Sequence, residues 1–336
     1  MKHHPVSPLI SVLMSVCNEP IEWIKQSIDS ILTQTFSDFE FIIINDNPER
    51  IELSNFLEKE SQKDFRINLY TNPENIGLTK SLNKGLKLCR GKYIARMDAD
   101  DYSFPTRLEE QVRYMEEHPE IVASSAFAYF WDGKDAKKEF KRPSHPDEIK
   151  VYIYITSPFI HPLLILRKNI LDRYNIHYDE NFRFGQDYKL AADLSEVGLL
   201  ANLDMPLLLY RQSTGQISAS RFIEQSNNAA IVRRNLINKF YTSHGLPSLP
   251  TRITTDTIKE NYRISESFKN DSDLSQDLRI AKVIRRILYH SLSKYTLKSL
   301  MLFLISRDYC DYPYTFKSFC SVILKHLKLK KQHKII

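Results

Sequence analysis

The first 120 residues alternate short apolar runs with longer stretches in which apolar residues recur every three or four positions. The short runs are typical of buried strands, and the longer stretches of helices with one buried face. Strands are expected at residues 9–16, 39–44, 67–71 and 93–97, with helices at residues 21–35, 78–89 and 105–118. Strands and helices that alternate at this spacing form βαβ units. The predicted fold class is therefore α/β with a mostly parallel sheet.

The pattern changes along the rest of the chain. Strands are expected at residues 121–131, 163–166 and 207–211, and helices at residues 147–155 and 188–197. Strand patterns stop near Ser220, and helical patterns continue to the C-terminus. We therefore expect two domains, an α/β domain over residues 1–220 and a helical region over residues 221–336.

Charge and composition constrain the partners and the compartment. The net charge of +6 is concentrated in residues 279–336, which contain thirteen Lys or Arg and two acids; this points to a partner rather than to chemistry. No apolar run reaches the ~18 residues of a membrane span, and the N-terminus lacks the apolar run of a secretory signal. The four cysteines show no paired C-x-x-C spacing. They are expected to be reduced thiols in a cytoplasmic protein.

Acidic residues follow one of the predicted strands directly, in the run Asp98-Ala99-Asp100-Asp101. Ligands of open α/β sheets bind beyond the carboxyl ends of the strands. Two carboxylates separated by one residue can share a hard divalent cation, which prefers oxygen ligands. A solvated acidic turn is the alternative, and a phosphatase-type nucleophile at Asp98 is a third. That class would place a hydroxyl residue soon after the second Asp, where Asp101 and Tyr102 stand instead.

Two further strands end in polar residues. Asp46 ends the second strand, where its carboxylate could accept hydrogen bonds from a base imide or a ribose hydroxyl, although Asp-Asn-Pro is also ordinary turn chemistry. Val16-Cys17-Asn18-Glu19 ends the first strand, with the same two interpretations. Three strand ends of this kind at one edge of a sheet indicate a single polar site.

Several motifs follow one another at regular spacing from residue 8 to residue 218. They read LISVLMSVCNE (9–19), SILTQTF (30–36), FEFIIIND (39–46), NIGLTKSLN (75–83), GKYIARMDADD (91–101), PTRLEEQ (105–111), GQDY (185–188) and LYR (209–211). Together they resemble the family 2 glycosyltransferases of GT-A fold. The resemblance implies a Rossmann-like, mostly parallel sheet flanked by helices, with a helical C-terminal extension. Residues 1–220 would then be the nucleotide-sugar-binding catalytic domain, and residues 221–336 a basic helical region.

The resemblance also implies a nucleotide pocket. Asp46 would contact the base, most often uracil. The backbone near Val16 and the side chains of Asn18 and Glu19 would line the same pocket. Lys80 stands where the family often has a basic residue near the phosphates.

The chemical step is assigned by the same resemblance. Asp98 would contact the ribose or a metal-bound water, and Asp100 would bind Mn²⁺ or Mg²⁺ bridging the diphosphate. Asp187 would be the catalytic base, although an Asp at this place before a helix is also an ordinary N-cap. Gln186 replaces a Glu that the family commonly has before the base.

The sequence departs from the family near the metal. Members often carry a His shortly after the Tyr-Arg of the last strand, and residues 212–218 contain none. Metal affinity would then be weaker, or another ligand would serve. His161 lies in a segment that often faces the acceptor, but a His before Pro at a strand start is more often structural.

The expected function is that of an inverting glycosyltransferase, an enzyme that moves a sugar from a nucleotide-diphosphate donor, with UDP as the expected nucleotide, to an acceptor hydroxyl. By analogy with the family, the acceptor would be a saccharide or lipid-linked saccharide in bacterial capsule, lipopolysaccharide or other surface-polysaccharide biosynthesis. The alternatives are a non-catalytic membrane- or partner-binding protein on a transferase scaffold, and a phosphatase-like hydrolase using Asp98. An NAD-linked dehydrogenase is disfavoured because the first strand-to-helix turn lacks G-x-G-x-x-G.

The basic C-terminal region has two competing interpretations. Residues 299–305 and 319–329 could place apolar faces on a membrane while neighbouring lysines meet anionic headgroups. They could equally pack on the catalytic domain. No nucleic-acid partner is expected, because no recognised binding module accompanies the charge. The expected location is cytoplasmic, with the inner face of the plasma membrane as a peripheral site.

Overall fold

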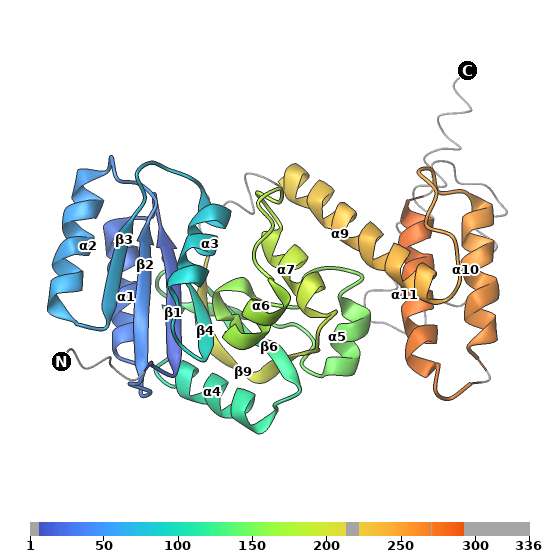
Figure 1. The fold of residues 1–336 in the computed structure, drawn as a ribbon, viewed down its shortest axis with the longest axis horizontal. Coiled ribbons are helices and arrows are strands. Elements are labelled where there is room, and N and C mark those ends of the chain that lie inside the picture. The colour runs from blue at the N-terminus through green and yellow to red at the C-terminus, as the bar shows by residue number, and fades with distance from the viewer. Residues whose placement is uncertain (1–6, 213–221, 270, 292–336) are drawn as a thin grey trace, which may run out of the picture. The chain divides into compact units, whose positions relative to one another are not determined.

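The computed structural model describes residues 7–212, 222–269 and 271–291 (Figure 1). The described residues fall into two compact units. An α/β unit is built from the residues up to Ile149 together with Thr156–Val232, and a helical unit from Lys150–Ile155 together with the residues from Arg233 onward.

The α/β unit contains a mixed sheet whose first four strands are parallel and in the order β3-β2-β1-β4. These strands are β1 (Ile10–Val16), β2 (Phe39–Asn45), β3 (Ile67–Thr71) and β4 (Tyr93–Asp98). Every residue of β1 and β2 is buried, as expected where helices cover both faces of a sheet. The register pairs Val16 with Asn45 and Ser15 with Asp98, so the carboxyl ends of β1, β2 and β4 lie side by side.

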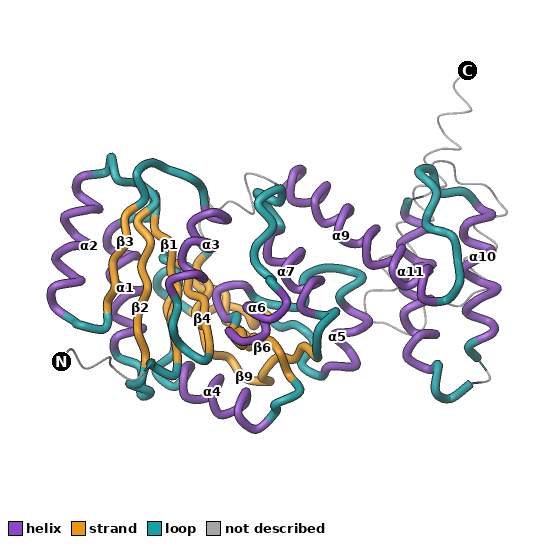
Figure 2. The backbone as a smooth tube through the Cα atoms, in the orientation of Figure 1, coloured by secondary structure: helices purple, strands orange, loops and turns teal. Residues whose placement is uncertain are grey.

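Helices alternate with these strands, as Figure 2 shows by colour. They are α1 (Ile21–Leu32), α2 (Ile51–Lys63), α3 (Leu78–Leu88) and α4 (Arg107–Glu117). Ile24, Ile28 and Ile31 lie on one face of α1 and pack into the main core with the strands. The sequence analysis did not predict α2, whose buried apolar side chains are only Leu53 and Leu57.

The rest of the sheet is mixed and continues in the order β8-β6-β9-β5, with β7 beside β6. These strands are β5 (Tyr102–Ser103), β6 (Ile121–Trp131), β7 (Ala136–Phe140), β8 (Ile165–Arg167) and β9 (Leu199–Arg211). β9 extends eight residues further toward the N-terminus than the expected strand. Asn202 interrupts the apolar pattern there, yet it is buried, because its amide donates to the carbonyls of Pro143 (2.6 Å) and Pro158 (2.9 Å).

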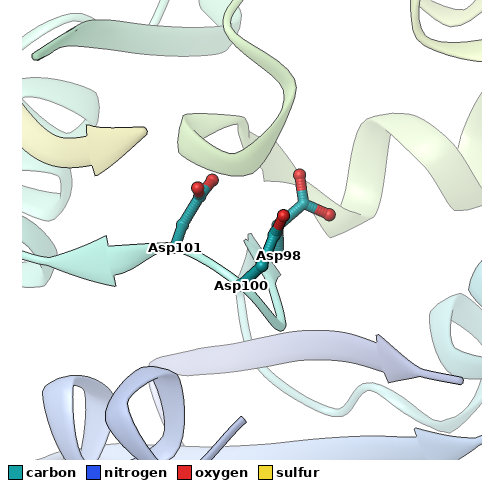
Figure 3. A group of neighbouring side chains, drawn as sticks. All are labelled: Asp98, Asp100 and Asp101. Carbon is teal, nitrogen blue, oxygen red and sulfur yellow. The ribbon is translucent and has the colours of Figure 1, made fainter. Parts of the chain in front are cut away.

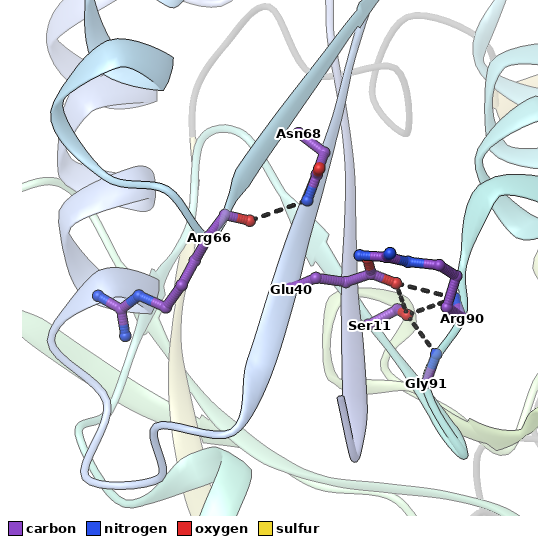
Figure 4. Close-up of polar contacts among 6 residues, drawn as sticks. All are labelled: Ser11, Glu40, Arg66, Asn68, Arg90 and Gly91. Carbon is purple, nitrogen blue, oxygen red and sulfur yellow. Dashed lines mark hydrogen bonds and ion pairs between the residues drawn. The ribbon is translucent and has the colours of Figure 1, made fainter. Parts of the chain in front are cut away.

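A polar cluster holds the amino-terminal end of the parallel strands (Figure 4). The buried Glu40 carboxylate accepts from the Ser11 hydroxyl at 2.7 Å and from the backbone and Nε of Arg90, both at 2.8 Å. The Gly91 backbone N–H donates to the Ser11 hydroxyl at 2.8 Å. A Cβ atom at Gly91 would lie 2.5 Å from the backbone nitrogen of Ser11. The chain therefore passes very close to β1 where β4 begins. The acidic residues at the end of β4 lie at the opposite, carboxyl-terminal end of the strands.

The helical unit has its own core of buried apolar side chains, which includes Val151, Phe240, Ile258 and Ile284. Its helices are α10 (Thr255–Ser267) and α11 (Ser275–His290), with the C-terminal parts of α5 (Pro146–Tyr152) and α9 (Phe222–Ser243). Thr254 caps α10 by a reciprocal pair of hydrogen bonds with Thr257.

Within the described ranges, no helix is both long enough and apolar enough to cross a membrane. The two segments expected to contact a membrane, residues 299–305 and 319–329, lie outside the described residues. So does most of residues 212–218, where the family's His is missing.

Candidate active site

Three carboxylates converge where β4 ends. Asp98, Asp100 and Asp101 project to the same side of the turn between β4 and β5 (Figure 3), and they offer oxygen atoms within 4.8 Å of one another. Mn²⁺ and Mg²⁺ take oxygen ligands, so this donor set fits such a cation. The sequence analysis assigned Asp98 and Asp100 to the site and left out Asp101.

The negative charges of the carboxylates repel one another. Burial raises the pKa of Asp100 to about 7, and the charges of Asp98 and Glu19 add to the rise. Burial also raises the pKa of Asp101 well above its usual value, with the charge of Asp100 as the next cause. A bound cation would favour the ionised forms and relieve this repulsion.

The positive charge of a buried arginine partly offsets the negative charges of these acids. Arg96, in β4, is 2% exposed and forms an ion pair with Asp98. Its charge also favours the ionised forms of Asp100 and Asp101. Sequence patterning could not identify Arg96, because a charged residue inside a buried strand gives no signal of what it faces.

Asp46 lies at the neighbouring strand end and is 2% exposed. Its backbone N–H donates to the Val16 carbonyl at 2.8 Å, which joins the ends of β1 and β2. Its carboxylate accepts from the Asn72 amide at 2.8 Å and from the backbone N–H groups of Ile76 at 2.9 Å and Gly77 at 3.0 Å. Asp46 therefore holds the loop that leads into α3, a role that the sequence did not suggest.

Asn18 and Glu19 follow β1 at the same edge. Asn18 is exposed, and its side-chain oxygen accepts from the Asn47 amide at 3.0 Å. Glu19 accepts from the backbone N–H of Cys17 at 2.8 Å. Burial raises the pKa of Glu19, and the charge of Asp98 raises it further. Glu19 therefore lies within electrostatic reach of the acidic turn.

Lys80 is exposed in the first turn of α3. That helix begins immediately after Gly77, whose N–H is bonded to Asp46. Lys80 therefore extends from the same loop-to-helix junction that Asp46 holds.

Asp187 comes from a separate segment, at the second position of α7 (Gln186–Leu194). Gly185, with a φ of +77°, precedes the helix and takes the N-cap position. Asp187 is consequently not the N-cap. It is half-buried, and burial raises its pKa, while the Tyr188 backbone, the Ser157 hydroxyl and the charge of Arg142 act in the opposite direction.

The buried Tyr178 is affected by the charges of both Asp187 and the acidic turn. Burial raises the pKa of the Tyr178 hydroxyl, and the charges of both Asp187 and Asp98 contribute in the same direction. The hydroxyl lies 2.8 Å from Nε2 of His161, whose pKa burial lowers well below its usual value. His161 is thus an uncharged partner of Tyr178.

The structure therefore places most of the residues expected from the sequence at one edge of the sheet. Those on the ends of the parallel strands are Val16, Asn18, Glu19, Asp46, Asp98 and Asp100. Asp187 comes from a separate segment, and its charge, like that of Asp98, raises the pKa of Tyr178.

Comparison with known proteins shows the family to which the chain is similar. The sequence model of the family described as glycosyl transferase family 2 matches residues 11–174. An uncharacterized glycosyltransferase of Haemophilus influenzae is 30% identical over 306 residues, covering 88% of this chain and 90% of that protein. The O-antigen biosynthesis glycosyltransferase WbnJ of Escherichia coli is 35% identical over 164 residues, covering 48% of this chain and 63% of WbnJ.

Solved structures share the fold at low sequence identity. S. aureus TarS 1–349, crystallised with UDP-GlcNAc, superposes with a TM-score of 0.57 at 15% identity, covering 96% of this chain and 92% of that one. The mannosyltransferase PcManGT of Pyrobaculum calidifontis, solved with GDP-Man and Mn²⁺, gives a TM-score of 0.51 at 14% identity, covering 96% and 88%.

The fold and the match along the sequence define a glycosyltransferase of GT-A type, which confirms the predicted fold class. The chain belongs to glycosyl transferase family 2. It spans about three fifths of the length of some relatives, such as WbnJ (63%) and an uncharacterized glycosyltransferase of Methanocaldococcus jannaschii (62%).

Proposed function

We propose that this chain is an inverting, metal-dependent glycosyltransferase that moves a sugar from a nucleoside-diphosphate donor, a UDP-sugar by expectation, to an acceptor hydroxyl. The observation that carries the proposal is the convergence of Asp98, Asp100 and Asp101 within 4.8 Å at the carboxyl end of β4. Asp46 at the neighbouring strand end and Asp187 on a separate segment supply the other groups that this reaction needs.

The acidic turn would hold the cation. Asp100, with Asp101 beside it, would bind Mn²⁺ or Mg²⁺, and Asp98 would contact the ribose or a water on the metal. When bound, the cation supplies Lewis-acid stabilisation of the departing diphosphate. The donor set is all carboxylate oxygen, which matches the preference of these ions.

The nucleotide would lie across the ends of β1 and β2. The backbone at Val16 and the side chains of Asn18 and Glu19 would form its walls. Oδ1 of Asp46 accepts two hydrogen bonds within the chain and Oδ2 accepts one, which leaves Oδ2 capacity for a base imide. Lys80 would approach the phosphates from α3.

Asp187 would act as the general base. An acceptor hydroxyl is a poor nucleophile, so a carboxylate must take its proton as the bond forms, which is typically worth about 10² to 10⁴ in rate. Burial favours the protonated form of Asp187, which makes its carboxylate a stronger base than an exposed Asp.

The names of two relatives support a proposal for the acceptor class. WbnJ is named for O-antigen biosynthesis, and AmsE of Erwinia amylovora, 30% identical over 216 residues, for amylovoran biosynthesis. We accordingly propose a saccharide or lipid-linked saccharide acceptor in surface-polysaccharide biosynthesis. The reaction would take place in the cytoplasm, with the basic C-terminal region against the anionic inner face of the membrane.

The rival assignment, a phosphatase-like hydrolase, requires Asp98 as a free nucleophile. The ion pair between Asp98 and the buried Arg96 stabilises the carboxylate and occupies it, which argues against that role.

Two variants test the division of labour. Asp100→Ala should abolish Mn²⁺-dependent donor binding, measured as a thermal shift with UDP-sugar. Asp187→Ala should keep that shift and lose transfer, measured as release of UDP in the presence of acceptor. Near-normal turnover by Asp187→Ala would show that the base is another residue.

A further inference from the structure

Arg211, the last residue of β9, is in contact with two tryptophan rings. Its guanidinium carbon lies 4.5 Å from the ring centre of Trp23, in α1, and 4.0 Å from that of Trp131, in β6. The side chain is buried, and these two rings are the only tryptophans in the sequence. A planar guanidinium packed over aromatic rings makes contacts that the ammonium group of lysine cannot reproduce.

The edge of the same guanidinium donates in two directions. Nε donates to the backbone carbonyl of Asp100 at 2.6 Å, and Nη2 donates to Oε1 of Gln26 at 2.7 Å. The backbone N–H of Arg211 donates to Oδ1 of Asp101 at 2.8 Å. One residue thus fixes the main chain of Asp100 and the carboxylate of Asp101, and anchors both to α1.

We propose that Arg211 is a positioning residue of the cation site, which sets the direction in which Asp100 and Asp101 present their carboxylate oxygens. This inference rests on the proposed metal-dependent function. Arg211 is not a ligand, since a guanidinium has no lone pair to offer a cation. The two rings restrain the planar group, and the planar group in turn orients the Asp100 carbonyl. The backbone N–H of the same residue orients the Asp101 carboxylate.

Replacing a residue that orients metal ligands without contacting the metal typically weakens metal binding by about 10- to 100-fold. Arg211→Lys keeps the positive charge but cannot donate from Nε and Nη2 together. We therefore expect this variant to weaken Mn²⁺ binding by about tenfold or more. Gln26→Leu removes only the anchor on α1, and we expect a smaller loss in the same direction.

The experiment measures Mn²⁺ affinity directly on the full-length protein, by electron paramagnetic resonance of the free ion, in the absence of nucleotide. Arg113→Lys, an exposed arginine on α4, is the matched control and should bind Mn²⁺ as the wild type does. A parallel Mn²⁺ titration of tryptophan fluorescence reports on the surroundings of Arg211, because the two rings in contact with it are the only tryptophans in the sequence. Thermal unfolding of each variant shows whether it folds, and Gln26→Leu provides the test if Arg211→Lys does not.

Each outcome decides a separate point. Weaker binding by Arg211→Lys, with Arg113→Lys unchanged, supports the positioning role. Wild-type affinity in both Arg211→Lys and Gln26→Leu overturns it and leaves the proposed function intact. If the wild type and Asp100→Asn bind Mn²⁺ equally, the metal site itself is wrong, and both proposals fail.

Discussion

Replacement of Asp46 by Asn should loosen the loop that leads into α3, even without any ligand. The carboxylate is 2% exposed and accepts from Asn72, Ile76 and Gly77. An Asn side chain can keep its oxygen toward two of these donors but turns its own N–H₂ toward the third. The loss of one charge-assisted hydrogen bond costs about 1.5–3 kcal/mol, and the unpaired buried N–H adds about 1–2 kcal/mol. The expected total is about 2.5–5 kcal/mol.

Thermal unfolding followed by circular dichroism would measure this cost. A unit of about 200 residues loses roughly 2–4 °C in Tm per kcal/mol, so a fall of about 10 °C is expected. Glu74→Gln is the matched control, because Glu74 is an exposed acid on the same loop, and surface changes of this kind stay within about 0.5 kcal/mol. A Tm for Asp46→Asn within about 1 °C of the wild type would refute the loop-holding role.

Three further predictions concern charge and packing. The pKa of Asp100, raised to about 7 from its ordinary 3.8, means that the folded protein keeps a proton that the unfolded chain releases, so this stabilisation is lost as pH rises from about 4 through 7. Without metal, the Tm of the wild type relative to Asp100→Asn should therefore be lower at pH 8 than at pH 5; an unchanged difference would contradict the raised pKa. Gly91→Ala should cost about 2–4 kcal/mol in urea unfolding, because its Cβ would lie 2.5 Å from the Ser11 nitrogen; wild-type stability would show that the strands can move apart. Glu40→Gln should lower the free energy of unfolding by about 1–3 kcal/mol, because it loses the ion pair with Arg90. This range allows for solvent screening, since that arginine is about half exposed. If 1 M salt leaves the stability difference between the two proteins unchanged, the cost is not electrostatic.

The parallel half of the fold could be predicted from the sequence because its strands are short, mostly apolar runs separated by helical patterns. β2, for instance, is buried at all seven positions. The extent of β9 could not be predicted, because Asn202 breaks the apolar pattern and its N–H₂ group donates to carbonyls from distant segments. Those carbonyls belong to Pro143 and Pro158, which are more than 40 residues away from Asn202 in the sequence.

The site residues were predictable where a strand ends in acids, and less so where a residue acts through its backbone or a neighbour. Asp101 adjoins Asp100, and only the observed turn brings both carboxylates to one side. Arg211 stands in a recognisable motif, but its contacts with Trp23 and Trp131 join three elements far apart in sequence. No local pattern records such a contact.

The most direct test of the whole account is a thermal-shift panel of UDP-, GDP-, CMP- and dTDP-sugars on the wild-type protein, with and without Mn²⁺. At a ligand concentration near 100 times Kd, binding adds about 2.7 kcal/mol, or roughly 5–10 °C in Tm. We expect a rise of this size for a UDP-sugar with Mn²⁺, and little rise without the metal or in Asp100→Ala. No shift with any of the four donors would contradict it and favour a protein that binds a partner without catalysis.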